Sequence, residues 1–184
     1  MRSLLIRPIQ AGFTLVELLI VVIIVAILAA IVVPQFTTAT ADAQEAALDA
    51  NLASLRSAIE LYRVQHNSVY PGVNAASGGT CPGGAAAGTG AAGSAEAFRA
   101  QLTMYSNASG QTCTLGDGTF RFGPYMRRMP SDPVIGSDAI AITATGALPT
   151  PTTATGGWAY ALQTGQIGMN HNGNDSRTRP YSTH

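Results

Sequence analysis

The chain has 184 residues, as many basic as acidic side chains and no net charge, and charged residues make up only 11% of it, against roughly 25% in ordinary globular domains. Every basic residue is an arginine, and the lack of lysine excludes a P-loop nucleotide site and a Schiff-base enzyme. The neutral balance also argues against a nucleic-acid partner, because such proteins usually carry a strongly basic patch. The one basic cluster, Arg121, Arg127 and Arg128, is interpreted as a solvated edge.

An apolar run follows the first twelve residues, which contain two arginines and no acid. Residues 13–33 carry Glu17 as their only charge. As a helix, this run would span about 32 Å, the thickness of a bilayer core. The next basic residue is Arg56, so the positive-inside rule places the N-terminus in the cytoplasm and everything after Pro34 outside.

Two ordinary interpretations of this run are a secretory signal peptide and an uncleaved anchor. A signal peptide has an apolar region of about 7–15 residues, shorter than this one. An uncleaved anchor leaves Glu17 unexplained, because a carboxylate in the bilayer costs about 2.5–3.5 kcal/mol and no basic residue lies within the run. A cut between Gly12 and Phe13 would supply a partner, since the new amine of Phe13 can pair with Glu17 of a neighbouring chain.

The segment GFTLVELLIVVIIVAILAAIVVPQF, residues 12–36, resembles the class III signal of type IV prepilins and type II secretion pseudopilins. The resemblance implies removal of residues 1–12 as a leader by a prepilin peptidase that cuts after Gly12, followed by N-methylation of Phe13. It also implies that Glu17 acts in assembly and that Pro34 occupies the position of a helix-kinking proline. Residues 13–36 would then form both the transmembrane helix and the filament core.

Residues 37–66 are predicted to continue the helix as an amphipathic segment. Apolar residues recur there at steps of three and four: Leu48, Leu52, Leu55, Ile59 and Tyr62. This stripe needs a cover, and residues 67–184 are the available candidate. We therefore expect an α+β, type IV pilin-like fold, in which the long N-terminal helix packs against a small antiparallel sheet of three or four strands.

The first part of residues 67–184 is poor in core residues. Residues 72–94 are rich in Gly, Ala, Ser and Thr and are predicted to form an irregular loop. Cys81 and Cys113 are the only cysteines, and an even count after an export signal favours a disulfide that closes the loop 81–113. Two free thiols are the alternative.

Periodicity predicts the elements that follow. Residues 95–105 have helical spacing, with Ser94 as the expected N-cap. Period-two alternation then predicts strands at 119–122, 139–143, 158–162 and 166–169.

Two stretches of this region carry a second resemblance. Residues 123–133, GPYMRRMPSDP, resemble the Gly-Pro-Tyr…Pro-x-Asp-Pro segment of major pseudopilins. Residues 157–160, GWAY, followed by Thr164-Gly165, are similar to the strand pair near the end of many of them. Both favour the secretion branch of the family.

An asparagine-rich turn lies close to the end of the sequence. Major pseudopilins often hold calcium in such a place, and Asn170, Asn172 and Asp175 offer oxygen ligands as weak candidates. The alternative is a simple turn in which Gly173 takes a positive φ. Residues 176–184 are expected to be frayed.

The function expected from these features is that of a filament-forming pilin-like subunit of the bacterial inner membrane, with its C-terminal domain in the periplasm. A pseudopilin of a type II secretion-like system is preferred, and a surface type IV pilin is the alternative. The expected partners are further copies, other pilin-like subunits, the prepilin peptidase, the platform protein, the assembly ATPase and the membrane. We expect no cofactor and no enzymatic activity, because the histidines are scattered and no nucleophile motif is present.

Overall fold

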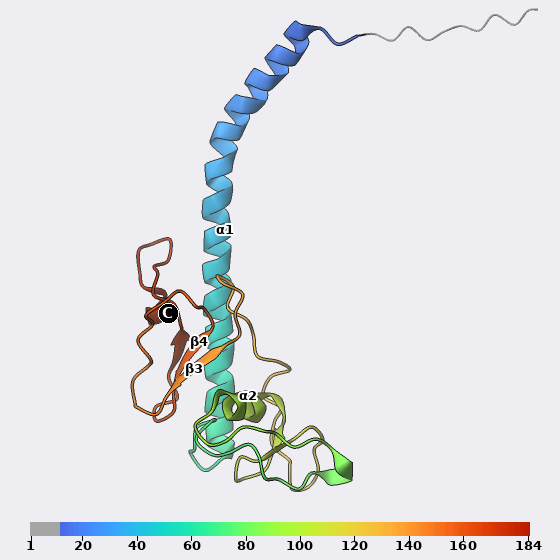
Figure 1. The fold of residues 1–184 in the computed structure, drawn as a ribbon, viewed down its shortest axis with the longest axis vertical. Helices are drawn as coiled ribbons and strands as arrows, with labels where there is room; N and C mark the ends of the chain where they lie inside the picture. Colours follow the sequence, from blue (N-terminus) through green and yellow to red (C-terminus); the bar gives the residue numbers. More distant parts are fainter. Residues whose placement is uncertain (1–11) are drawn as a thin grey trace, which may run out of the picture. The chain divides into compact units, whose positions relative to one another are not determined.

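The computed structural model describes residues 12–184, which form two compact units, one ending at Thr40 and the other spanning Ala41–His184. The helices are α1 (Leu15–Gln65), which begins in the first unit and ends in the second, α2 (Ala95–Thr103), and the 3₁₀ turns η1 (Pro82–Gly84) and η2 (Tyr181–Thr183) (Figure 1). The strands are β1 (Tyr105–Ser106), β2 (Thr112–Cys113), β3 (Ile140–Thr143), β4 (Trp158–Ala161) and β5 (Ile167–Met169). The predicted α+β class is confirmed.

The core of the second unit is built on the apolar stripe of α1. Every member of the predicted stripe is buried, each at most 1% exposed: Leu48, Leu52, Leu55, Ile59 and Tyr62. They share one cluster with Phe98 and Leu102 of α2 and with Trp158, Tyr160 and Met169 of the sheet. The stripe prediction is confirmed, and the part of α1 that carries the stripe belongs to the same compact unit as the residues that cover it.

Helix α2 begins where the sequence predicted. The Ser94 side chain accepts a hydrogen bond from the Ala97 N–H, at 3.1 Å, as an N-cap does. The helix ends at Thr103, two residues earlier than expected, because Tyr105 joins strand β1. Its buried face presents Phe98 and Leu102 to the core.

The main sheet has the order β3-β4-β5 and is mixed rather than antiparallel. Strands β4 and β5 are antiparallel, as expected, but β3 pairs with β4 in parallel, with Ile140 opposite Trp158. The expectation of an all-antiparallel sheet is therefore wrong for this pair. A parallel pair requires a return connection of roughly a dozen residues or more. Residues 144–157 form that connection between β3 and β4.

A close backbone approach fixes the start of β4. Gly157 has a φ of +78°, and a Cβ there would lie 2.3 Å from the carbonyl oxygen of Ala139. Only glycine fits this contact, which lets the Trp158 N–H donate to the same carbonyl at 2.8 Å.

A small hairpin that the sequence did not predict precedes the first predicted strand. Strands β1 and β2 pair in antiparallel register, with Ser106 opposite Thr112. The predicted strand 119–122 is wrong, since its one bridge joins Phe122 to Ser106. Residues 117–120 instead form a turn in which the Asp117 carboxylate accepts from the N–H groups of the two residues that follow Gly118.

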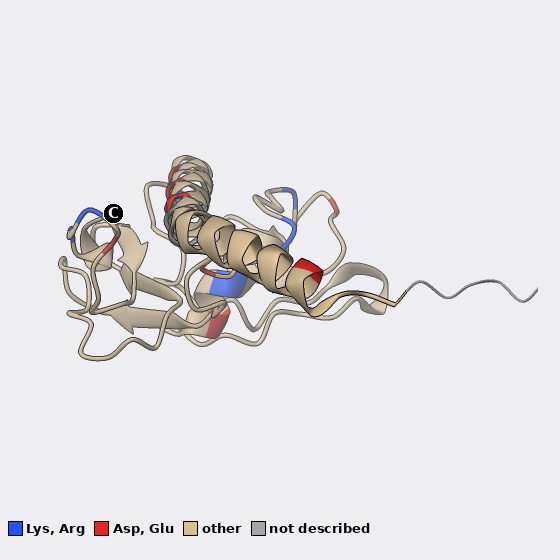
Figure 2. Cartoon of the chain, turned by 90° about the horizontal axis from the view of Figure 1, so that it is seen from above, with Lys and Arg blue, Asp and Glu red and all other residues tan. Residues whose placement is uncertain are grey.

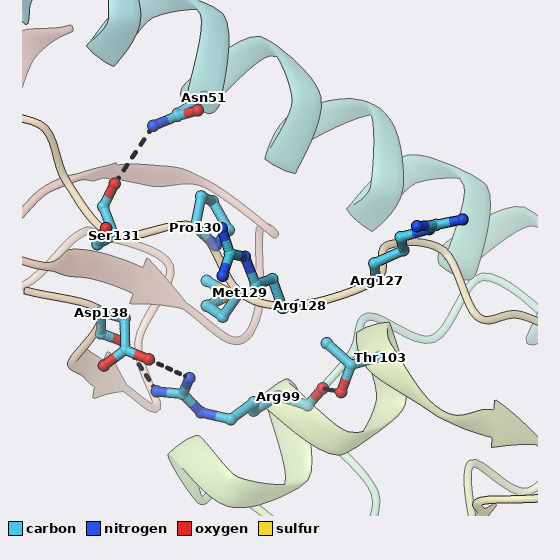
Figure 3. A pocket seen from close by; sticks show the side chains of 9 residues that line it. All are labelled: Asn51, Arg99, Thr103, Arg127, Arg128, Met129, Pro130, Ser131 and Asp138. Carbon is cyan, nitrogen blue, oxygen red and sulfur yellow. Dashed lines mark hydrogen bonds and ion pairs between the residues drawn. The ribbon is translucent and has the colours of Figure 1, made fainter.

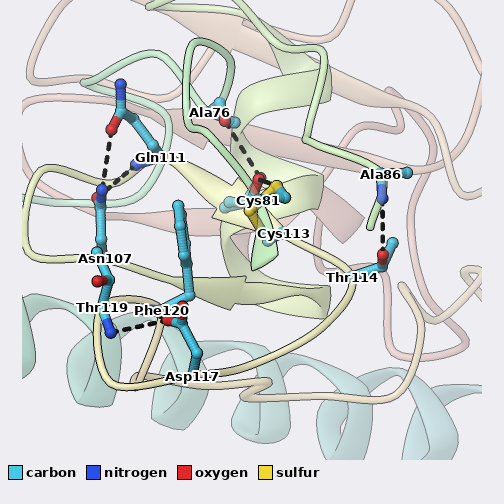
Figure 4. Close-up of a disulfide and its surroundings, with 11 residues drawn as sticks. Ala76, Cys81, Ala86, Asn107, Gln111, Cys113, Thr114, Asp117, Thr119 and Phe120 are labelled. Carbon is cyan, nitrogen blue, oxygen red and sulfur yellow. Dashed lines mark hydrogen bonds between the residues drawn. A yellow bond between two sulfur atoms is a disulfide. The ribbon is translucent and has the colours of Figure 1, made fainter. Parts of the chain in front are cut away.

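Cys81 and Cys113 form the predicted disulfide, with their Cα atoms 5.7 Å apart (Figure 4). It ties the Gly- and Ala-rich loop to β2, which is buried at Cys113. Hydrogen bonds continue this attachment, because the Gly88 N–H donates to the Thr112 carbonyl and the Ala86 N–H to the Thr114 hydroxyl. In chain-entropy estimates, a disulfide that closes a loop of this length adds roughly 3–4 kcal/mol to the free energy of unfolding.

The C-terminal residues are not frayed, and that expectation is wrong. Ser176 donates hydrogen bonds to the buried carboxylate of Glu45 through its N–H and its hydroxyl. The Arg56 guanidinium donates to the His184 carbonyl oxygen at 2.7 Å, and the His184 ring lies 2.9 Å from the Asp49 carboxylate. The tail thus packs on the polar side of α1.

Truncating the middle of the stripe tests this arrangement. Leu52→Ala removes a fully buried side chain, so we expect a loss of about 2–5 kcal/mol in the free energy of unfolding. Leu61→Ala is the matched control, because Leu61 lies on the same helix and is 50% exposed. Thermal unfolding followed by near-ultraviolet circular dichroism measures both. Equal losses would contradict the assignment of the stripe as the core.

Candidate functional site

The first half of α1 is an apolar helix with exposed side chains. Residues Leu15–Val33 have a mean hydropathy of 3.4, and none of them is buried. Length and composition allow this helix to cross a membrane. Side chains of this kind need contact with lipid or with other apolar helices. Along this segment the ribbon is free of basic residues and carries a single acidic position (Figure 2).

That acidic position, Glu17, belongs to a capping box. Thr14 precedes α1 and is its N-cap, and Glu17 is the third helical residue. The Thr14 N–H and hydroxyl donate to Glu17 Oε2 at 3.0 and 2.7 Å, and the Glu17 N–H donates to the Thr14 hydroxyl at 3.2 Å. These are the reciprocal bonds of the Thr-x-x-Glu motif. The carboxylate also lies at the positive end of the helix dipole.

Sequence reasoning missed Thr14. It sought a charged partner for Glu17 and overlooked neutral donors within the same chain. The motif Thr14-Leu-Val-Glu17 was a readable signal for this contact. These neutral donors bind a carboxylate oxygen of Glu17 but bring no positive charge to it.

The expected cleavage point lies directly before this cap. Gly12 and Phe13 precede α1, Phe13 is 80% exposed, and nothing lies within 4 Å of a Cβ built on Gly12. The rest of the expected leader, residues 1–11, lies outside the described residues. Pro34 lies inside α1, which continues through it to Gln65. Cleavage, methylation and the role of Pro34 remain predictions.

The first two calcium candidates make hydrogen bonds to a segment outside their own turn. The Asn170 amide donates to the Thr155 hydroxyl at 3.3 Å, and the Asn172 amide donates to the Thr152 carbonyl at 3.1 Å. Gly173 does not adopt the positive φ of the alternative interpretation, and its N–H donates to a ring nitrogen of His171 at 2.8 Å. Both asparagines therefore connect this turn to residues 152–155.

The third candidate, Asp175, is surrounded by donors. Its carboxylate accepts from the N–H groups of Arg177 and Arg179 and from the Arg179 guanidinium, and it lies 3.2 Å from a ring nitrogen of His184. Burial acts to raise the pKa of Asp175, but the Arg179 N–H and guanidinium and the Arg177 N–H outweigh it and lower the pKa to about 2. Among residues 12–184, no group of three or more His, Cys, Asp or Glu side chains is arranged to hold a metal ion. Calcium binding stays a prediction, and calcium would have to displace these donors.

The Pro-Ser-Asp-Pro stretch buries a carboxylate within the second unit. Asp132 is 1% exposed and accepts from four backbone N–H groups: Val134, Ile135, Ser137 and Gly157. Its contact with Gly157, at 2.8 Å, joins this stretch to the start of β4. The carboxylate thereby replaces regular secondary structure in satisfying these backbone groups.

Aromatic residues of segments 123–133 and 157–160, which resemble segments of major pseudopilins, connect these segments to other parts of the second unit. The Trp158 ring N–H donates to the Pro130 carbonyl at 2.8 Å, and the Tyr160 hydroxyl donates to the Pro71 carbonyl at 3.0 Å. The Tyr125 hydroxyl donates to the Gln65 amide oxygen at 2.7 Å, at the end of α1. These motifs therefore serve the packing of the second unit.

Comparisons with known proteins agree with the N-terminal geometry. Residues 7–33 match the family model of the prokaryotic N-terminal methylation motif. The chain is also 43% identical over 58 residues to the type IV narrow pilus major component PilA5 of Thermus thermophilus. The chain is a type IV pilin-like protein.

The likeness of this pilin-like chain to its relatives covers only part of it. The match to PilA5 spans 32% of this chain and 50% of PilA5, so the chain spans about half the length of the curated relative it matches. No solved structure matches the chain.

A serine–histidine contact lies within the second unit of the pilin-like chain. The Ser106 hydroxyl is 3.1 Å from His66 Nε2, while His66 Nδ1 lies 2.9 Å from the Tyr62 carbonyl oxygen. The His66 ring stacks on that of Tyr62, with centroids 3.8 Å apart. Ser106 and His66 are at most 1% exposed, so a substrate has no access to this hydroxyl. The pair stabilises the junction of α1 with the β1–β2 hairpin.

His66 makes the stability of the second unit depend on pH. Burial lowers the pKa of His66 below its ordinary value of about 6.5, although hydrogen bonds to the backbone of Tyr62 and Asn107 act in the opposite direction. The unfolded chain therefore binds the proton more readily than the folded chain. Stability is fully present above pH ~6.5 and falls as the pH drops toward the folded pKa.

We accordingly expect the melting temperature of the full chain in detergent to decrease on acidification below pH ~6.5. His66→Gln is expected to lower the melting temperature at neutral pH and to flatten this pH dependence. Melting curves between pH 7 and pH 5 measure both effects. An unchanged slope in the variant would show that another group titrates.

Proposed function

We propose that this chain is the subunit of a filament and that it assembles through the apolar half of α1. The observation that carries the proposal is the exposed apolar helix Leu15–Val33, with its single carboxylate, Glu17, in a methylation-motif segment. A membrane can hold this helix before assembly, and the same surface can pack against helices of other copies afterwards. The second unit has its own core and does not need this surface for folding.

Cleavage of the leader would provide the positively charged partner that Glu17 needs. A prepilin peptidase would cut after Gly12, leaving a methylated amine on Phe13 at the start of α1. In a neighbouring copy Glu17 would pair with this amine. A buried carboxylate without that pairing is costly, so only subunits in the correct register satisfy it. The Thr14 cap holds the carboxylate at the helix end while the subunit waits in the membrane.

The most specific version of the proposal is a pseudopilin of a type II secretion-like system. The subunit would lie in the inner membrane with its N-terminus in the cytoplasm and its second unit in the periplasm. A platform protein and an assembly ATPase would drive its addition to a periplasmic filament with other pilin-like subunits. Residues 123–133, whose Asp132 organises the core, support this branch through their resemblance to major pseudopilins.

A surface type IV pilin is the second candidate. The similarity to PilA5, which is named as a pilus component, favours it, and so does the disulfide at Cys81 and Cys113. PilA5 matches only part of this chain, so the similarity supports filament formation more strongly than it supports one branch.

Substitutions at the capping box separate the cap from the charge. Glu17→Gln keeps an oxygen acceptor for Thr14 but removes the negative charge, so we expect it to abolish or strongly reduce filaments, and we expect the same of Glu17→Ala. Thr14→Ala removes the cap and keeps the charge, so filaments are expected to persist. Electron microscopy and the yield of sheared filaments measure assembly.

Intact mass serves as the control for processing in these variants. The mature chain should begin at a methylated Phe13 in each of them, so that a loss of filaments is not a loss of cleavage. Normal filaments from Glu17→Gln would rule out the charge pairing. An N-terminus at Met1 or beyond Phe13 in the parent chain would rule out the processing step.

Deleting the gene distinguishes the two branches. For a pseudopilin, we expect specific proteins to disappear from the medium while surface fibres remain. For a surface pilin, the fibres disappear and the secreted proteins are unchanged. Mass spectrometry of the medium and electron microscopy of the cells measure the two outcomes, and the second would overturn the preferred branch.

A further inference from the structure

A basic cleft in the second unit is not explained by filament assembly through α1. The cavity has a volume of about 730 Å³ and is bordered by α1, α2 and the loop before β3. Its charged lining residues are Arg99, Arg127, Arg128 and Asp138 (Figure 3). Three guanidiniums against one carboxylate give this lining a formal charge of +2 (three minus one), in a chain with no net charge. Arg121, which sequence analysis grouped with two of them, does not line the cleft.

One wall of the cleft is fixed by an ion pair. Arg99 donates to the Asp138 carboxylate at 2.7 Å and to the Asp138 backbone carbonyl at 2.8 Å. This fork holds the Arg99 side chain against the segment that leads into β3. It also uses the carboxylate of Asp138, so that this acid is not available to the other two arginines.

The opposite wall carries two arginines without partners. Arg127 and Arg128 are exposed, and neither makes a hydrogen bond or an ion pair with any residue from 12 to 184. The like charges of these two neighbouring residues repel each other, while the charge of Arg99 is balanced by Asp138. An anion in the cleft would relieve that repulsion.

The backbone that carries these two arginines is anchored on both sides. Before them, the N–H groups of Tyr125 and Met126 both donate to the Leu102 carbonyl at 3.0 Å. After them, Met129 is buried in the core and the Pro130 carbonyl accepts from the Trp158 ring. A ligand would therefore order the side chains of the two arginines without having to order their backbone, which limits the entropic cost of binding.

The cleft is completed by its contact with α1. The Asn51 amide donates to the Ser131 carbonyl at 3.3 Å. This bond ties the loop that carries Arg127 and Arg128 to α1. In Figure 3, Asn51, Arg99 and Arg128 come from three separate segments around one hollow. Cavities of roughly 300–1,000 Å³ are the usual size for small-ligand sites.

We propose that this arginine cleft binds an oxyanion, a phosphate or carboxylate group, through Arg127 and Arg128. Guanidinium groups present paired N–H donors that match the two oxygens of such groups, and they stay charged at every physiological pH. The group would come either from a free anion in solution or from acidic side chains of a neighbouring protein. The site itself does not depend on the proposed filament.

The test uses the full chain in neutral detergent micelles, titrated with inorganic pyrophosphate and with citrate at physiological salt. We expect saturable binding by calorimetry. Arg127→Gln/Arg128→Gln should weaken it by roughly tenfold or more, because charged hydrogen bonds are lost. Arg177→Gln is the matched control, since Arg177 is an exposed arginine outside the cleft. Melting temperatures close to that of the parent confirm that the variants are folded.

Binding that does not saturate, or that weakens equally in Arg177→Gln, would overturn the proposal and leave these arginines as a solvated edge. Repeating the titration on assembled filaments identifies the source of the group. If filaments still bind pyrophosphate, the ligand is a free anion. If micellar chains bind it and filaments do not, carboxylates of a neighbouring copy occupy the cleft. Both of these results uphold an oxyanion site.

Discussion

The stripe from Leu48 to Tyr62 on α1 is the surface on which the second unit is built. Apart from its share of α1, this unit has one short α-helix, a two-stranded hairpin and a sheet of three short strands, and none of these has enough apolar surface to form a core alone. Burying the stripe against Phe98, Trp158 and Tyr160 supplies that core. A single helix thus carries an exposed apolar surface in its first half and the apolar stripe of the second unit's core in its second.

Because the second unit has little regular secondary structure, hydrogen bonds from buried polar side chains fix many of its loops. The Asp132 carboxylate gathers four backbone N–H groups of two separate segments. The Gln101 side chain, which is fully buried, accepts from the Gly72 N–H and donates to the carbonyls of Asn74 and Gly110. Such contacts satisfy backbone groups that no strand or helix would otherwise pair. They make the loops specific without requiring a large core.

The charged side chains divide into those used inside the unit and those left at its surface. Glu45 and Asp175 order the C-terminal tail, and Asp138 fixes Arg99. Arg127 and Arg128 have no such internal role within the described chain. In a protein with only 11% charged residues, two adjacent unpaired arginines beside a cavity are the group most suited to an external partner.

The sequence alone determined the features that depend on local order. The apolar run with Glu17, the stripe of α1, the Ser94 cap and strands β3 to β5 follow from periodicity, caps and composition, which neighbouring residues set. Tertiary structure decided the parallel pairing of β3 with β4, the packing of the C-terminal tail and the cleft between Arg99 and Arg128. Each of these joins residues far apart in the chain, and their contacts depend on backbone positions that no local pattern specifies.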